Sequence, residues 1–268
     1  MTGDRLDPAR LALTDHSYQL STDSHGPETS IIVPCLNEAE NVTAILKAIN
    51  DVVVANRLSV EVLLIDDFSD DDTFQIAMRQ VPEFPALHLR VIRRYQPRRG
   101  YGAVIRYGIA HARGNYCVCV SADCVDPVHL LPRFLEKKRT GVDLVQCSRY
   151  ENVQDKKTLP WKFRIAHFFY RRLVRVLMGP GLSDTTYPFR MFNRVDVLAM
   201  GISQNTFSIS PEIFFKILLN GGRIEYLAHS QGLRQRGLSK FRFSKEGTRY
   251  GYVLIRAWWH KLGVILWF

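Results

Sequence analysis

The chain has 268 residues, of which 46% are hydrophobic and 23% are charged, and its formal net charge at pH 7 is +10. A chain of this length and apolar content can bury a substantial core, so we expect a globular protein rather than a disordered one. The charge is unevenly distributed, since the chain from Glu151 onward has 19 Lys and Arg against 7 Asp and Glu. The basic half is expected to meet an anionic partner: nucleic acid, a lipid headgroup or a phosphorylated substrate.

The cysteines and the start of the chain are typical of a cytosolic protein. The five cysteines lie in the first 147 residues without C-x-x-C pairs, and we interpret them as reduced core residues. The start MTGDRLDPAR carries acids and no apolar core, and no uncharged run of about 18 residues is present, so we expect neither a signal peptide nor a membrane span. Residues 1–28 are expected to form a flexible polar extension.

The first half alternates strand and helix patterns, which predicts a mostly parallel sheet. Asn37 is placed to cap the first helix, with Glu40 three residues later for a capping box. The glycines of 98–114 do not form G-x-G-x-x-G after the first strand, so we interpret them as a tight turn rather than a dinucleotide site. The expected strands are 30–34, 60–65, 87–92, 116–120 and 142–147, and the expected helices start after Asn37 and lie near 73–79, 102–112 and 128–139.

The second half is basic and aromatic, and it continues the first without a low-complexity linker. It predicts a helix over 161–178, a strand over 185–192, a helix over 211–222, a strand over 223–228 and a basic loop over 232–247. We divide the chain into a main α/β domain over 29–243 and an amphipathic helix over 244–268, which either lies on a membrane interface or packs against the domain.

Four motifs follow one another in an informative order, and most of them stand where a predicted strand ends. They are VPCLNEAEN (33–41), LLIDDFSDDDT (63–73), SADCVDP (121–127) and RQRGLSK (234–240). In open parallel sheets ligands bind at the carboxyl ends of the strands. With this ordered set, the sequence from about residue 30 to about 250 resembles the family 2 inverting glycosyltransferases, and within them the dolichol-phosphate mannose synthase-like branch. The resemblance implies a GT-A type nucleotide-diphospho-sugar transferase fold, with a mixed, mostly parallel sheet flanked by helices.

The resemblance also assigns the residues that bind a nucleotide-sugar donor. It implies that Asp67 hydrogen-bonds the base, while Asp70 to Asp72 are better explained as acids that favour a helix N-terminus. The imino N–H of uracil and that of guanine would both suit Asp67, so UDP- and GDP-sugars stay open. The other residues implied at the donor are Pro34, Leu36, Glu38, Ala122, Asp123 and Arg234.

The acceptor decides which groups catalysis needs. A phosphate monoester is already an anionic nucleophile and needs cations rather than a base, whereas a hydroxyl acceptor needs a base such as Glu or Asp. The resemblance implies that Asp184 lies in the active site, where it orients acceptor or metal. Glu212 is either a base or a first-turn residue stabilised by the helix dipole. The cations implied on the donor and acceptor phosphates are Arg149, Arg164, Arg234 and Lys240.

The metal motif of the family is altered in this chain. Where the family has D-A-D and often a polar residue two positions later, this chain has Ser121, Ala122, Asp123 and Val125. A hard divalent cation prefers carboxylate oxygens, so Mg²⁺ or Mn²⁺ is expected to bind weakly, through Asp123. Asp126 either compensates for the missing ligand or caps the following helix.

The aromatic tail predicts contact with a membrane surface. Trp258, Trp259, Trp267 and Phe268 alternate with basic residues, as in a segment that lies on an anionic leaflet; packing on the domain and a dimer face are the alternatives. We therefore expect a cytoplasmic, peripheral enzyme on the inner face of a membrane that transfers a sugar to polyprenyl phosphate with inversion. Transfer to a hydroxyl, with Glu212 or Asp184 as base, is the alternative. A nucleic-acid-binding module ranks far behind because the sequence has no groove-reading motif.

Overall fold

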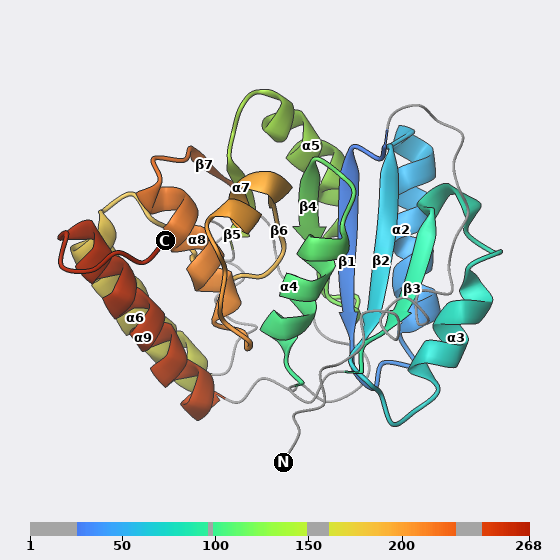
Figure 1. Cartoon of the computed structure of the whole chain (residues 1–268), viewed down its shortest axis with the longest axis horizontal. Coiled ribbons are helices and arrows are strands. Elements are labelled where there is room, and N and C mark those ends of the chain that lie inside the picture. The colour runs from blue at the N-terminus through green and yellow to red at the C-terminus, as the bar shows by residue number, and fades with distance from the viewer. Residues whose placement is uncertain (1–25, 96–98, 149–160, 229–242) are drawn as a thin grey trace, which may run out of the picture.

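The computed structural model describes residues 26–95, 99–148, 161–228 and 243–268, with side chains described from residues 165 and 246 onward in the last two ranges. These residues form a seven-stranded sheet in the order β3-β2-β1-β4-β6-β5-β7, with helices on both faces (Figure 1). The strands are β1 (Thr29–Cys35), β2 (Val60–Asp66), β3 (Leu89–Arg93), β4 (Tyr116–Cys119), β5 (Leu144–Ser148), β6 (Arg190–Asn193) and β7 (Ile224–Ala228). The α-helices are α2 (Val42–Asn56), α3 (Thr73–Gln80), α4 (Tyr101–His111), α5 (Leu131–Arg139), α6 (Trp161–Met178), α7 (Arg194–Ala199), α8 (Ile209–Leu219) and α9 (Phe243–Lys261).

The sheet is mixed and mostly parallel, which confirms the expected fold class. Only β6 runs antiparallel to its neighbours β4 and β5 among the described strands. β1 and β2 pair in register along their whole length, so Cys35 lies opposite Asp66 at their carboxyl ends. The loops that follow β1 and β2 therefore leave the sheet side by side.

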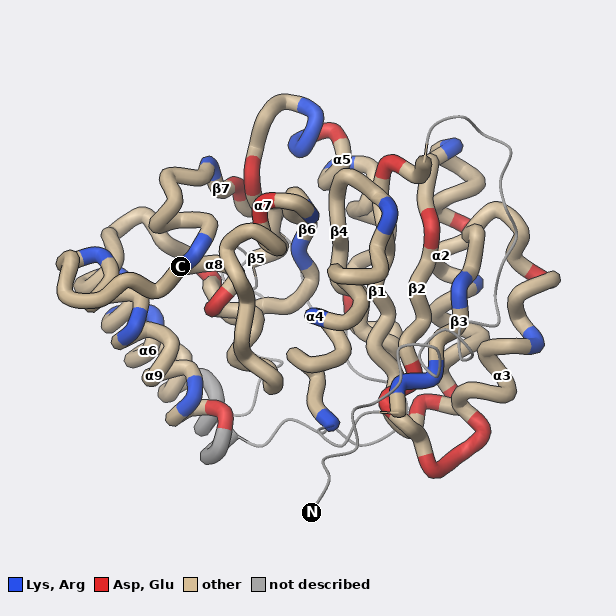
Figure 2. Tube along the Cα trace, in the orientation of Figure 1, with Lys and Arg blue, Asp and Glu red and all other residues tan. Residues whose placement is uncertain are grey.

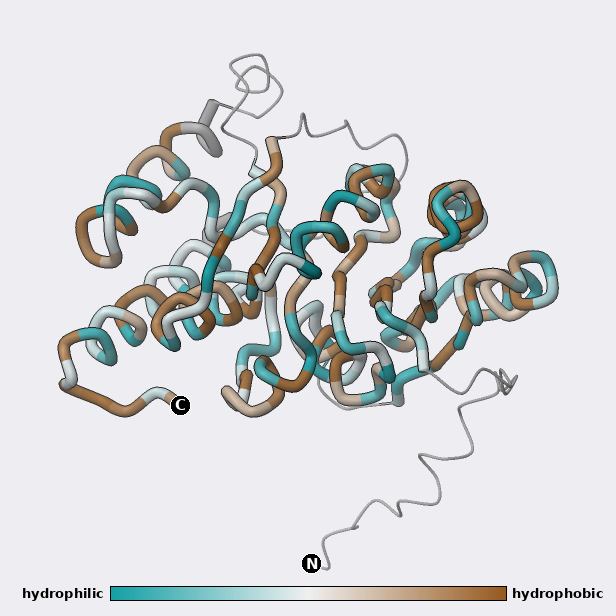
Figure 3. The backbone as a smooth tube through the Cα atoms, turned by 90° about the horizontal axis from the view of Figure 1, so that it is seen from above, coloured by the Kyte–Doolittle hydropathy of each residue, from teal (hydrophilic) through white to brown (hydrophobic). Residues whose placement is uncertain are grey.

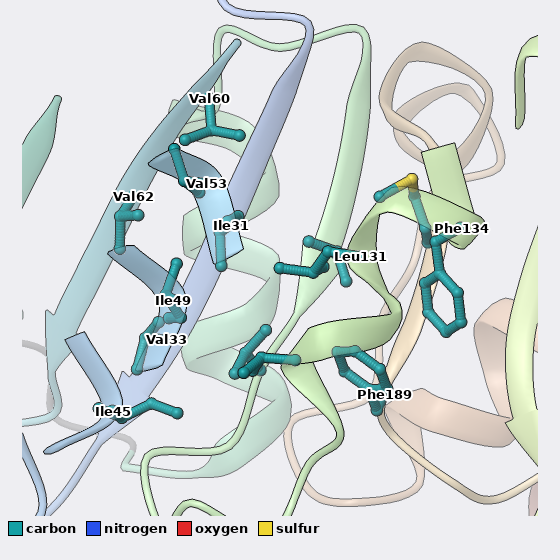
Figure 4. Packing of buried hydrophobic residues seen from close by; sticks show 14 of the residues in the cluster. Ile31, Val33, Ile45, Ile49, Val53, Val60, Val62, Leu131, Phe134 and Phe189 are labelled. Carbon is teal, nitrogen blue, oxygen red and sulfur yellow. The ribbon is translucent and has the colours of Figure 1, made fainter. Parts of the chain in front are cut away.

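Alternate residues of the central strands point to opposite faces, and each face has its own core. On one face Ile31 and Val33 of β1 pack with α2 and α5, as Figure 4 shows for Ile45, Ile49 and Leu131. On the other face, residues of β1 and β2 belong to a second core with α4, α8 and α9. Both faces are apolar because both are covered, which is why the strands read as continuous apolar runs in the sequence.

α9 packs against α8 and α6 on the second face, far from the β3 edge (Figure 1). Val253, Leu254 and Ala257 of α9 are fully buried, whereas its other side is exposed together with part of α6. The chain after α9 is strongly apolar and appears brown near the C-terminus in Figure 3. No helix in the described ranges has the length and apolar character needed to cross a bilayer.

Several local expectations were wrong. Asn37 does not cap α2: it lies five residues before Val42 with φ +51°, and its Oδ1 accepts a hydrogen bond from Asp70 N at 2.9 Å. The expected strand over 185–192 is reduced to β6, because residues 184–187 form a turn around the Asp184 carboxylate. Cys124 is exposed rather than part of the core, while the other four cysteines are buried and free.

Candidate active site

A pocket of about 350 Å³ lies at the carboxyl ends of β1, β2 and β4. It is where a parallel sheet places a ligand, since the strand-end loops diverge there. Six of the residues that the sequence assigns to a donor line it: Pro34, Leu36, Glu38, Asp67, Ala122 and Asp123. The remaining lining residues are Cys35, Gly100, Tyr101, Val104, Ser121, Thr206, Phe207 and Glu246.

The loops after β1 and β2 hold each other in place beside the pocket. Thr73 Oγ1 accepts a hydrogen bond from Glu38 N at 2.8 Å, and Ser69 Oγ accepts one from Asn37 N at 2.8 Å. Asp66 is fully buried and accepts from Ser69, and its burial raises its carboxyl pKa. The acids of this loop form the red stretch between β2 and α3 in Figure 2. Most of them build the loop, and Asp67 is the one that lines the pocket.

Asp67 is 3% exposed and connects three segments of the chain. Its Oδ1 accepts from both Nε (2.9 Å) and Nη2 of Arg94, which follows β3. Its Oδ2 accepts from the backbone N–H of Gly100 at 2.9 Å, at the start of α4. The carboxylate therefore fixes the first turn of α4 against the end of β2.

The loop after β4 presents Ser121, Ala122 and Asp123 to the pocket, and Asp126 supports this loop from behind. The Asp126 carboxylate accepts from Ser121 N at 2.7 Å and from the Tyr187 hydroxyl at 3.0 Å. The side chain does not cap the following helix, so that expectation was wrong. Burial raises the pKa of Asp126 to about 6, with the nearby Asp123 charge acting in the same direction.

The metal-binding capacity of this loop is small. No group of three or more His, Cys, Asp or Glu side chains in the described ranges is arranged to hold a metal ion. Asp126 has its two oxygens on Ser121 N and Tyr187, so it is placed to build the loop rather than to replace the missing ligand. Asp123 is the one carboxylate of this loop that lines the pocket. A Mg²⁺ ion held by a single carboxylate needs further oxygens from the substrate's phosphates.

One wall of the pocket is formed by Thr206 and Phe207 of the segment 203–207, a feature that sequence reasoning missed. Its carbonyl groups press on the start of α4, where an added Cβ at Gly102 would lie 2.6 Å from the carbonyl oxygens of both Gln204 and Thr206. Only glycine permits this approach. Phe207 stacks on Tyr101 with ring centroids 4.7 Å apart. The glycines after residue 98 thus serve a close backbone contact beside the pocket.

Glu212 binds the start of the segment 203–207 and does not line the pocket. The side chain is 0% exposed, and its carboxylate accepts from Ser203 N at 3.0 and 3.1 Å, from Ser203 Oγ at 2.9 Å and from Gln204 N at 2.8 Å. Lys216 Nζ lies 3.4 Å from its Oε1. All of these contacts are within the protein, so the arrangement is that of a structural carboxylate.

Glu246 of α9 is a pocket residue that no sequence pattern indicated. It is 5% exposed and accepts from Thr206 Oγ1 at 3.0 Å and from Arg249 at 2.5 Å. The C-terminal helix therefore reaches the same pocket as the ends of β1, β2 and β4. No local signal marks this glutamate, because its position follows from the packing of α9 on α8.

The remaining predicted residues are Asp184 and the four cations. Asp184 is 1% exposed, and its Oδ1 accepts from the N–H groups of Thr186 and Tyr187, so it organises the turn before β6 and does not line the pocket. Arg164 belongs to α6, but its side chain is outside the described part. Arg149, Arg234 and Lys240 lie outside the described residues.

Comparison with known proteins supports the resemblance seen in the motifs. Residues 30–198 match the family described as glycosyl transferase family 2. A dolichol-phosphate mannosyltransferase of Pyrococcus furiosus is 29% identical over 226 residues, 80% of this chain and 59% of that protein. A bactoprenol glucosyl transferase of Shigella phage SfV is 26% identical over 217 residues, 79% of this chain and 66% of that protein. The chain thus spans less than two thirds of the length of these curated relatives.

Solved structures share the fold at low sequence identity. A glucosyl-3-phosphoglycerate synthase from Mycobacterium tuberculosis, crystallised with Mn²⁺, uridine diphosphate and phosphoglyceric acid, matches with a TM-score of 0.63 and 19% identity. The match covers 87% of this chain and 79% of that chain. The likeness shows that the fold is of the GT-A type, as the sequence predicted.

Proposed function

The chain belongs to glycosyl transferase family 2, and we propose that it transfers a sugar from a nucleotide-diphosphate donor to a polyprenyl phosphate. The observation that carries the proposal is the convergence of Pro34, Leu36, Glu38, Asp67, Ala122 and Asp123 on one pocket. These residues come from three separate strand ends. Both curated relatives named above act, by their names, on polyprenyl phosphates or bactoprenol.

The pocket suits the donor chemically. Asp67 offers a carboxylate oxygen to a ring N–H of the base, and Glu38 lies near the end of β1, where a ribose hydroxyl needs an acceptor. Asp123, further along the pocket on the β4 loop, is where the diphosphate would lie. A bound Mg²⁺ or Mn²⁺ would neutralise charge on the leaving diphosphate, held by Asp123 and by the donor's own oxygens.

A phosphate acceptor suits the surroundings of the pocket. One acceptor oxygen forms a bond to the anomeric carbon from the face opposite the diphosphate, and the bond to the diphosphate breaks with its electron pair on the leaving nucleotide. This single displacement inverts the anomeric centre and needs no base, because the nucleophile is already ionised. Glu212 and Asp184, the bases of the alternative hydroxyl reaction, are both buried away from the pocket. Their positions support the phosphate acceptor.

The cations that the reaction needs are proposed from the motifs. Arg149, Arg234 and Lys240 stand in S-R-Y and R-x-R-G-x-S-K, and Arg164 stands in the first turn of α6. Their role is to hold the acceptor phosphate against the donor diphosphate, whose two negative charges would otherwise repel it. Changing Arg149, Arg164 or Lys240 is expected to reduce transfer more than donor binding.

The acceptor's lipid chain requires access from a membrane, and the surface formed by α6 and α9 is suited to provide it. We propose that this α6–α9 surface lies on the cytoplasmic leaflet and makes the enzyme peripheral. Lys and Arg recur along both helices in Figure 2. Apolar side chains between them bind the interface while the cations meet anionic headgroups. The exposed apolar residues are Ile165, Phe168, Phe169, Leu173 and Val176 of α6, and Tyr252, Ile255 and Trp259 of α9.

A direct test supplies labelled UDP- and GDP-sugars with a short-chain polyprenyl phosphate. The proposal predicts a lipid-linked sugar with inverted anomeric configuration from at least one donor. Asp123→Asn should strongly reduce the product, whereas Asp51→Asn, an exposed surface acid of α2, should not. Transfer to a hydroxyl compound, without any lipid-linked product across the donors, would overturn the proposal.

A further inference from the structure

The hydrogen bonds at the base-binding end of the pocket limit which nucleotide it accepts. Asp67 is the pocket carboxylate at the end of β2, and three protein donors already bind it. Arg94 donates to Oδ1 through both Nε, at 2.9 Å, and Nη2. The Gly100 N–H donates to Oδ2 at 2.9 Å.

The number of acceptor positions on a carboxylate is limited. Its two oxygens offer about four lone-pair sites in total. The two bonds from Arg94 fill both sites of Oδ1, and the bond from Gly100 fills one site of Oδ2. Among the described residues this count leaves a single site, on Oδ2, for a base.

The arrangement is fixed rather than adaptable. The Asp67 side chain is 4% exposed and that of Arg94 is 5% exposed, so water cannot readily replace either partner. Arg94 is also held by its backbone, whose N–H donates to the Asp66 carbonyl oxygen at 2.8 Å. Rotating Asp67 to present both oxygens to a ligand would break the ion pair and release the start of α4.

Uracil and guanine make different demands on such a carboxylate. Guanine presents its ring N1–H and its amino N2–H side by side, which together require two acceptor sites. Uracil presents one N3–H between two carbonyl groups and requires one site. A guanine bound here would leave a buried donor unpaired, and an unpaired buried donor is costly.

We propose that the Arg94–Asp67–Gly100 arrangement selects a uracil base over guanine, so that the donor is a UDP-sugar. This inference rests on the proposed function, because it concerns the base of the nucleotide-sugar donor. Arg94 is then a positioning residue, which acts through Asp67 and does not touch the nucleotide itself.

The test is calorimetric titration of the full chain with UDP and with GDP, both in the presence of Mg²⁺. One unpaired donor predicts that UDP binds at least about tenfold more tightly than GDP. Equal affinity, or tighter binding of GDP, would overturn the inference and leave the proposed transfer to lipid phosphate intact. Binding of neither nucleotide would refute the nucleotide-sugar donor and this inference together.

Arg94→Lys provides a second measurement that a purely structural role would not affect. Lysine keeps the positive charge, but its single ammonium group replaces the two N–H groups of arginine that bind Oδ1. The substitution therefore frees one acceptor site on Oδ1. The ratio of UDP to GDP affinity should fall several-fold. Arg93→Lys is the matched control, since Arg93 pairs with Asp66 rather than Asp67, and its ratio should equal that of the wild type. An unchanged ratio in the folded Arg94→Lys variant would contradict the count of acceptor sites.

Discussion

Replacing Glu212 by Gln separates a structural carboxylate from a catalytic base. The substitution turns one of two carboxylate oxygens into an NH₂ group, a donor that faces the N–H groups of Ser203 and Gln204. Lys216, which is 1% exposed, loses its counter-charge and keeps its hydrogen bonds to the carbonyl oxygens of Met200 and Gly201. The perturbation is therefore a broken buried ion pair together with a donor–donor conflict.

The magnitude follows from these contacts. Removing one partner of a buried ion pair costs about 3–5 kcal/mol, and the retained amide oxygen places Glu212→Gln near the lower end, about 3 kcal/mol. For a domain of this size the melting temperature should fall by roughly 6 to 12 °C. Because Glu212 holds the segment 203–207 that forms the pocket wall, the KM for the donor should rise.

The assay combines thermal unfolding, followed by circular dichroism, with steady-state kinetics well below the melting temperature. The structural role predicts a destabilised enzyme whose kcat falls by less than about tenfold, whereas loss of a general base lowers kcat by about 10²- to 10⁴-fold. Glu83→Gln, an exposed acid, is the control and should change neither quantity. A drop of kcat beyond a hundredfold with an unchanged melting temperature would refute the structural role of Glu212.

Three further predictions concern other parts of the site. The raised pKa of Asp126, about 6 against 3.8, means that the folded protein binds this proton more tightly than the unfolded chain, so ionisation between pH 4 and pH 6 costs wild-type stability. In EDTA, the urea-measured stability of Asp126→Asn should therefore gain about 2 kcal/mol relative to wild type from pH 4 to pH 7. Gly102→Ala should weaken UDP binding, measured by titration, by about tenfold or more, because the added Cβ displaces the pocket wall. Gly251→Ala is the control and should not weaken binding, because no atom lies near the added Cβ. Phe169→Ser should reduce co-sedimentation with anionic vesicles by about tenfold, whereas Val54→Ser on α2 should not.

For each of these three predictions, one experimental result would contradict it. Parallel stability curves for wild type and Asp126→Asn across pH 4 to 7 would show that the carboxyl titrates normally. Wild-type UDP affinity in Gly102→Ala would mean that the wall is not part of the donor site. Equal vesicle binding by Phe169→Ser and Val54→Ser would exclude the α6–α9 surface as the membrane contact.

The strand-end residues were the predictable part of the site. Pro34, Asp67 and Asp123 each follow a continuous apolar run, and parallel strands bring such positions to one edge of the sheet. The fold class followed from the same alternation of strands and helices. Local sequence was sufficient here because each residue is within a few positions of the buried strand that places it.

The remaining part depends on contacts between distant segments. Glu246 reaches the pocket only because α9 packs on α8, and Asp126 supports the β4 loop through Tyr187, 61 residues away. In sequence, Asp184 and Glu212 resemble catalytic acids. What distinguishes them from catalytic acids is the set of N–H groups that donate hydrogen bonds to their carboxylates. A motif gives the residue type at a position but not its hydrogen-bond partners.

We propose that the acceptor nucleophile is a phosphate rather than a hydroxyl. The most direct measurement compares polyprenyl phosphate with the polyprenol of the same chain length, using one labelled donor and the same detergent. Sugar transfer is expected to the phosphate and none above background to the alcohol, because the phosphate needs no base. Transfer to the alcohol at a comparable rate would contradict it.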